Sequence, residues 1–256
     1  MNIFLLTLQN KNKLLYYFGW CNLAGALLCI VMWLFTDTVV LGINSWIKPL
    51  KFFLSTIIFS WSMGWYLPDL RMPKVSLVYS WIVIIVLSFE NIYIVIQAAK
   101  GELSHFNGTD HFHGLMFTLM GVMIGILTVW TFIIGVLFFI RRMPNLPSAY
   151  KWGIRIGIMT FVAFAMVGGL MAANLSHTVG APDGGEGLVL LNWSTQFGDL
   201  RVAHFLGMHA LQVFPLAGYY LFRQKTSYQV VFMLIYIGSC VFVLWQALSG
   251  IPLLTI

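Results

Sequence analysis

The chain has 256 residues, of which 60% are hydrophobic and only 9% are charged. A soluble domain carries about 25% charged residues, so this composition excludes an ordinary soluble protein and predicts one embedded in a lipid bilayer. The net charge of +6 comes from basic residues spread over short segments. This pattern is not the clustered basic face of a nucleic-acid-binding protein, and it favours contact with the membrane surface.

Apolar segments long enough to cross a bilayer recur along the whole chain. A spanning helix needs about 20 mostly apolar residues. Hydropathy and Pro, Gly and Asp punctuation give seven segments, at residues 14–36, 46–68, 75–99, 113–140, 152–174, 201–222 and 228–250. We therefore predict an all-α polytopic membrane protein in which residues 1–256 form a single bundle of seven transmembrane helices. No internal sequence repeat is evident, so an inverted-repeat transporter is not predicted.

Basic residues are concentrated in alternate loops, and this sets the expected orientation. The N-terminus and the second, fourth and sixth loops, with their flanks, contain one acid, Asp69, and ten basic residues: Lys11, Lys13, Arg71, Lys74, Arg141, Arg142, Lys151, Arg155, Arg223 and Lys225. Lysine and arginine are retained on the cytoplasmic side of a membrane. We therefore predict a cytoplasmic N-terminus and an extracytoplasmic, or outer, C-terminus.

With this orientation, the ionisable chemistry collects at the outer end of the bundle. All six histidines lie there or in the outer half: His105, His111, His113, His177, His204 and His209. Lys48 and Lys51 begin the second segment, and Arg201 begins the sixth. Ionisable groups inside a membrane cost about 2.5–3.5 kcal/mol or more, so we expect them to face the bundle interior and to mark a functional site.

Glu90 and His209 lie deepest. At 1.5 Å per residue, each lies about 12–13 Å below the outer end of its helix, and we predict that both act as acid–base groups on one ligand. The expected substrate-binding residues are Lys48, Lys51, Gln97, Arg201 and Gln212. Two structural alternatives stay open: Glu90 pairs with a lysine only to fix helix register, and the histidines are only interfacial residues.

A metal site would need ligands from several helices. His204 and His209 are about 140° apart around a helix, so they do not chelate one ion together, and no His-Glu-x-x-His motif is present. Zinc or another divalent metal would therefore need a combined ligand set, taken from His209, Glu90, His204 and His177. Haem is less favoured, because an axial ligand is needed inside the bundle and only His209 lies deep.

A glycine-rich run at residues 180–187 precedes the sixth segment. It lacks the spacings of a phosphate-binding loop or an EF-hand. We expect either an ordered turn or lid over the outer mouth, or a plain flexible loop.

Two stretches carry a resemblance. Residues 46–55 (WIKPLKFFLS) and residues 198–205 (GDLRVAHF), continued by His209-Ala210-Leu211-Gln212, resemble a group of bacterial seven-helix inner-membrane proteins without an assigned activity. The resemblance implies a multi-pass location in a bacterial inner membrane. It implies no catalytic residues.

Three functions are compatible with this pattern. The first is a membrane enzyme acting on a lipid or other amphipathic anionic substrate in a polar, histidine-rich pocket open to the extracytoplasmic side. The second is a transporter or ligand sensor using the same pocket, which polar residues continuing toward the inner face would favour. The third is a haem- or metal-binding subunit of a membrane assembly.

Overall fold

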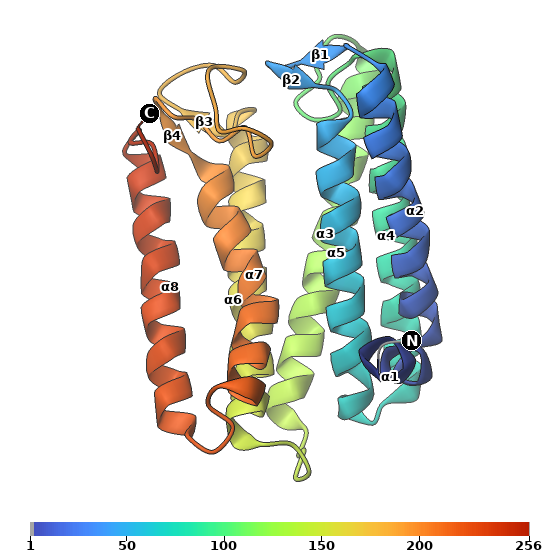
Figure 1. The fold of residues 1–256 in the computed structure, drawn as a ribbon, viewed down its shortest axis with the longest axis vertical. Coiled ribbons are helices and arrows are strands. Elements are labelled where there is room, and N and C mark those ends of the chain that lie inside the picture. Colours follow the sequence, from blue (N-terminus) through green and yellow to red (C-terminus); the bar gives the residue numbers. More distant parts are fainter. Residues whose placement is uncertain (1–2, 256) are drawn as a thin grey trace. The chain divides into compact units, whose positions relative to one another are not determined.

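The computed structural model describes residues 3–255, and within them the protein is built from α-helices with two very short β-hairpins (Figure 1). Each of the seven predicted segments corresponds to one helix, with ends within four residues of the expected ones. These helices are α2 (Lys13–Phe35), α3 (Ile47–Tyr66), α4 (Pro73–Lys100), α5 (His111–Ile140), α6 (Ser148–Asn174), α7 (Leu200–Tyr220) and α8 (Thr226–Leu248).

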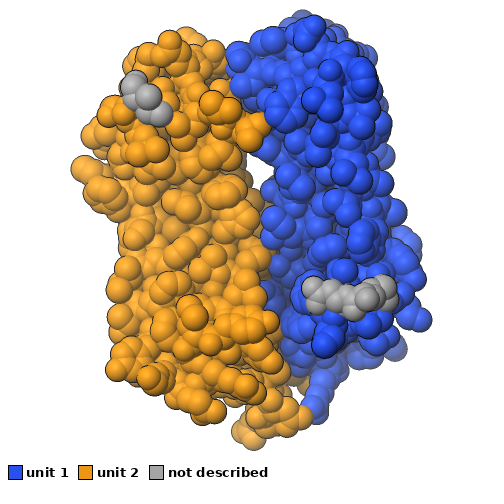
Figure 2. Space-filling model, viewed as in Figure 1, with its two compact units in different colours: residues 1–127 blue, residues 128–256 orange. Residues whose placement is uncertain are grey.

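The chain divides into two compact units, residues 1–127 and residues 128–256, so the predicted single bundle has an internal subdivision (Figure 2). The boundary falls inside α5. Unit 1 also contains α1 (Ile3–Lys11), the strands β1 (Val39–Val40) and β2 (Ile43–Asn44), and the 3₁₀ helix η1 (Leu67–Leu70). Unit 2 also contains the strands β3 (Thr178–Val179) and β4 (Gly198–Asp199).

The two units share a series of elements: a helix, two short strands and two further helices. In unit 1 these are α2, β1, β2, α3 and α4, with α1 before them and η1 between α3 and α4; in unit 2 they are α6, β3, β4, α7 and α8. Each strand pair is antiparallel, and the middle helix contacts both other helices of its unit. No sequence repeat is evident, so the repetition is one of topology.

Five helices are long and apolar enough to cross a membrane: α2, α4, α5, α6 and α8. The other two long helices, α3 and α7, carry the lysines, the arginine and the deep histidines that lower their hydropathy. They are also the middle helices of their units. Polar side chains on a helix between two others can face protein instead of lipid, as the cost of burying charge in hydrocarbon requires.

Unit 1 begins with a helix that hydropathy does not predict. The ring of Phe4 on α1 stacks on Trp65 with 4.9 Å between centroids, and the Lys11 ammonium lies 3.3 Å from a carboxylate oxygen of Asp69. Burial raises the pKa of Asp69 above its ordinary value, although the charge and hydrogen bond of Lys11 act in the opposite direction. These contacts hold the N-terminal helix against the end of α3.

Buried amides and hydroxyls join the three helices of unit 1. The side-chain nitrogen of Asn91 donates to the side-chain oxygen Oδ1 of Asn22 at 2.8 Å and to the Thr56 hydroxyl at 3.2 Å. All three residues are buried. Hydrogen bonds between helices satisfy polar groups that have no water in a bilayer core, so this triad fixes α2, α3 and α4 in register.

Unit 2 is packed by glycines where α6 meets α7. A Cβ added at Gly153 would lie 2.6 Å from the carbonyl oxygen of Phe214, and one at Gly157 would lie 2.8 Å from that of Ala210. Small residues let helix backbones approach closely in membranes. This contact fixes the position of α7, whose first residues carry Arg201 and His204.

Candidate functional site

Three polar side chains lie on one face of α4 in unit 1. Glu90, Tyr93 and Gln97 follow the i, i+3, i+7 spacing of a helix face, and their exposed fractions are 2%, 5% and 1%. We call them the α4 polar face. Each has one oxygen without a hydrogen-bond partner among the described residues: Glu90 Oε1, Tyr93 Oη and Gln97 Oε1. Most buried polar atoms are paired, so three unpaired atoms in a row favour a ligand or water site.

Lys48 lies at the start of α3, which packs against α4 in unit 1. Three of the predicted site residues, Lys48, Glu90 and Gln97, therefore belong to neighbouring helices of one unit, and Glu90 and Gln97 share one face of α4. Phe52 of α3 and Met120 of α5 pack with Tyr93 in the same apolar cluster.

A group of ionisable residues lies beyond the C-terminal end of α4, which is the outer end in the predicted orientation. Of its members, the sequence analysis named His113 but not its two acidic partners. The His113 ring contacts Asp110 through Nδ1 at 2.8 Å and Glu102 through Nε2 at 3.2 Å. Gln97 donates to the same Glu102 oxygen at 3.3 Å. We call Glu102, Asp110 and His113 the outer cluster. Through Gln97, it connects directly to the α4 polar face.

The outer cluster has a local origin that the sequence contains. Asp110 precedes α5 and accepts the backbone N–H of His113 at 2.9 Å, as an N-capping aspartate does. That backbone hydrogen bond, followed by the bond from the His113 side chain, lowers the pKa of Asp110. An aspartate three residues before a histidine at a helix start could have identified this pair.

In unit 2, two aspartates order the loop formed by residues 175–199. The Asp183 carboxylate accepts the Ser176 hydroxyl and the Thr178 backbone N–H, both at 2.9 Å, and lies 2.9 Å from His177 Nδ1. Burial alone would raise the pKa of Asp183, but the hydrogen bonds from His177, Thr178 and Ser176 and the charge of His177 outweigh it and lower this pKa. Of the two expectations for the glycine-rich run, the described structure has the ordered turn.

Asp199 is the second of these aspartates. It is 1% exposed, caps α7 by accepting the backbone N–H of Arg201 at 3.0 Å, and accepts that of Ser194 at 2.9 Å. It also pairs with the Arg201 guanidinium, with Nη2 to Oδ2 at 2.6 Å and Nε to Oδ1 at 2.9 Å. Arg201 Nη2 also donates to the carbonyl oxygen of Asn192. The charge expected to bind a substrate is thus largely balanced by Asp199.

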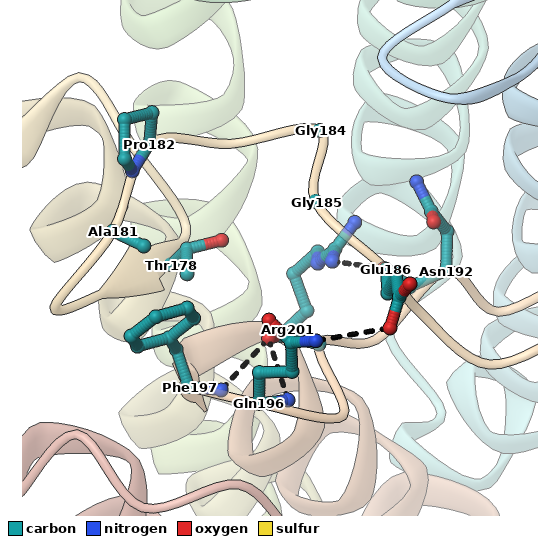
Figure 3. Close-up of a pocket in the computed structure, with 11 residues that line it drawn as sticks. Thr178, Ala181, Pro182, Gly184, Gly185, Glu186, Asn192, Gln196, Phe197 and Arg201 are labelled. Atoms are coloured by element: carbon teal, nitrogen blue, oxygen red, sulfur yellow. Dashed lines mark hydrogen bonds between the residues drawn. The ribbon is translucent and has the colours of Figure 1, made fainter. Parts of the chain in front are cut away.

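Arg201 lines a small pocket beneath the glycine-rich run (Figure 3). The pocket has a volume of about 40 Å³, enough for ordered water or a group of a few atoms. Figure 3 shows the Arg201 side chain rising from the start of α7 toward the segment that contains Gly184 and Gly185. Gly184 adopts a positive φ of 98°, which favours glycine at this turn. The other lining residues are Thr178, Ala181, Pro182, Glu186, Asn192, Ser194, Gln196 and Phe197.

The loop should open in acid. A lowered folded-state pKa means that ionised Asp183 stabilises the loop above the unfolded value of about 3.9, and that this stabilisation is lost as the pH falls through the folded pKa. We expect the hydrogen-exchange protection factors of the 177 and 178 amides to fall by up to about ninefold between pH 7 and pH 3, because at pH 3 Asp183 of the opened loop binds a proton and that of the folded loop does not. Asp183→Asn should show the lower protection at both pH values. Equal protection in the wild type at both pH values would contradict this role.

The histidines of α7 have separate environments. His204 Nδ1 lies 2.8 Å from the carbonyl oxygen of Phe164 on α6. His209 Nδ1 lies 3.3 Å from the side-chain oxygen Oε1 of Gln212, as expected for residues on one helix face. The centroids of the His209 and Phe205 rings are 4.3 Å apart. Arg201 turns instead to Asp199.

The described residues contain no group of three or more His, Cys, Asp or Glu side chains that could hold a metal ion. His177 pairs with Asp183, and His204 with a backbone carbonyl. These contacts do not support a zinc or haem site. The histidines that were expected to share one pocket have different partners and do not form one cluster among the described residues.

No family model, no curated protein and no solved structure matches this chain.

Proposed function

We propose that this chain is a transporter of a small anionic or amphipathic solute in a bacterial inner membrane. The observation that carries the proposal is the repeated organisation of the two units, each with a helix, a strand pair, a polar middle helix and a third helix. Many secondary transporters are built from structural repeats. The middle helices begin with basic residues in both units, Lys48 and Lys51 in α3 and Arg201 in α7.

Buried polar residues in unit 1 extend beyond the outer half. The Asn91 triad lies level with Glu90, and further toward the start of α4 lie the fully buried Ser60 and the 2.9 Å hydrogen bond from Asn12 to Ser80. An inner continuation of polar side chains was the feature expected of transport. It supports transport over a site confined to the outer surface.

The enzyme hypothesis places Glu90 and His209 on one substrate. These residues belong to different units, and among the described residues the printed side-chain contacts of His209 are with Gln212 and Phe205. That hypothesis stays a prediction, as does the shared cavity of Lys48, Lys51, Glu90, Arg201 and His209.

The proposal includes seven spanning helices and a cytoplasmic N-terminus. A reporter fused after Ile256 should therefore behave as extracytoplasmic, and one inserted near Pro144 as cytoplasmic, because the loop between α5 and α6 carries Arg141 and Arg142. Alkaline phosphatase and fluorescent-protein fusions at both positions provide the measurement. The reverse pattern would place the polar residues on the cytoplasmic side.

Charge movement in proteoliposomes tests transport. The full chain is reconstituted and adsorbed to a solid-supported membrane, and acetate, succinate, inorganic phosphate and glycine are applied as concentration jumps. We expect at least one probe to evoke a saturable transient current that protein-free liposomes lack. The absence of a current with every probe, together with an unchanged unfolding temperature in each, would contradict the proposal.

A further inference from the structure

We propose that the outer cluster and the α4 polar face form a proton-access path that connects the extracytoplasmic water with Glu90. This inference concerns the ion that such a transporter would couple to, but its geometry lies wholly within unit 1 and its test needs no transported solute.

The entrance of the path is at the protein surface. The side chains of Asp110 and Glu102 are 56% and 43% exposed, whereas that of His113 between them is 11% exposed. The imidazole contacts Asp110 through Nδ1 and Glu102 through Nε2. A histidine held this way can accept a proton on one ring nitrogen and release one from the other, so that its net protonation is unchanged after each transfer.

The inner part of the path leads from Glu102 along α4. Gln97 contacts Glu102, and Tyr93 lies on the same face of α4 one helical turn further in. Glu90 follows after another turn. The unpaired oxygens of Gln97, Tyr93 and Glu90 lie in succession, and ordered water typically satisfies such buried polar atoms. Water joining them would carry the proton past the Gln97 amide, which is not itself an acid–base group at neutral pH.

The transfer is balanced in protons and charge. A proton taken from the outer water ends on the Glu90 carboxylate, which becomes a neutral carboxylic acid. Tyr93 lies one turn away on α4, the outer cluster lies beyond Gln97, and Lys48 on α3 is near enough for its charge to act on this carboxylate.

Infrared spectroscopy of the purified full chain in lipid, without solute, tests the path. We expect a protonated-carboxyl C=O band that titrates with pH and is lost in Glu90→Gln. After a switch to D₂O, the deuterium shift of this band measures proton access to Glu90.

Three variants decide the route. His113→Gln keeps hydrogen bonding without proton transfer, and Glu102→Gln removes the next acid. Each should slow the deuterium shift about tenfold or more, because a positioned acid–base group contributes about 10²- to 10⁴-fold. His111→Ala, at an exposed histidine two residues away, should exchange at the wild-type rate. A band that persists in Glu90→Gln, or wild-type exchange in both His113→Gln and Glu102→Gln, would overturn the proposal.

Discussion

Glu90→Gln should abolish solute-evoked charge movement, reducing the current by about 100-fold or more, while leaving the helical content unchanged. The amide keeps the shape of the carboxyl group but cannot exchange a proton, and positioned acid–base groups typically contribute about 10²- to 10⁴-fold. The measurement is the peak transient current at equal amounts of reconstituted protein.

The matched control for this prediction is Asp37→Asn, which neutralises an exposed acid in the same unit. It should retain the wild-type current. A Glu90→Gln current equal to that of the control would remove Glu90 from the transport mechanism.

Asp199→Ala should lower the free energy of unfolding by about 3–5 kcal/mol, the cost of removing one partner of a buried ion pair. The substitution leaves the Arg201 guanidinium without its carboxylate and removes the cap of α7 and the acceptor of the Ser194 amide. Denaturant unfolding of the purified protein, followed by circular dichroism, gives the value.

The double variant Asp199→Ala/Arg201→Met separates charge from capping. Because the unpaired guanidinium is then gone, we expect it to recover part of the loss, with about 1 kcal/mol remaining for the cap. A double variant no more stable than Asp199→Ala would show that the ion pair contributes little.

The long helices were predictable because the hydropathy of a segment depends only on the residues of that segment. The helix α1 was missed because Ile3–Lys11 is too short to span a bilayer, and it is held by contacts with Trp65 and Asp69 more than 50 residues away. The division into two units and the repeated topology were also missed. They depend on which helices pack together, and hydropathy contains no such information.

The candidate site was predictable where it depends on the spacing of residues within one helix, and not where it depends on contacts between helices. The i, i+3, i+7 spacing of Glu90, Tyr93 and Gln97 is sufficient to put them on one helix face. The partners of Arg201 and His113 were not predicted, because membrane depth and net charge do not indicate helix capping. Asp199 and Asp110 stand directly before α7 and α5, where capping aspartates are common. The Asn22, Thr56 and Asn91 triad joins three helices and could not be read from any local pattern.

The stability of a Glu90 and Lys48 double-mutant cycle tests most directly whether Glu90 serves function instead of helix register. Because Oε1 of Glu90 already lacks a partner, we predict that Glu90→Gln changes the free energy of unfolding by less than about 1 kcal/mol. The coupling energy with Lys48→Met should stay below about 0.5 kcal/mol. A loss of about 3–5 kcal/mol in Glu90→Gln that the double variant restores would contradict the account and make Glu90 half of a structural ion pair.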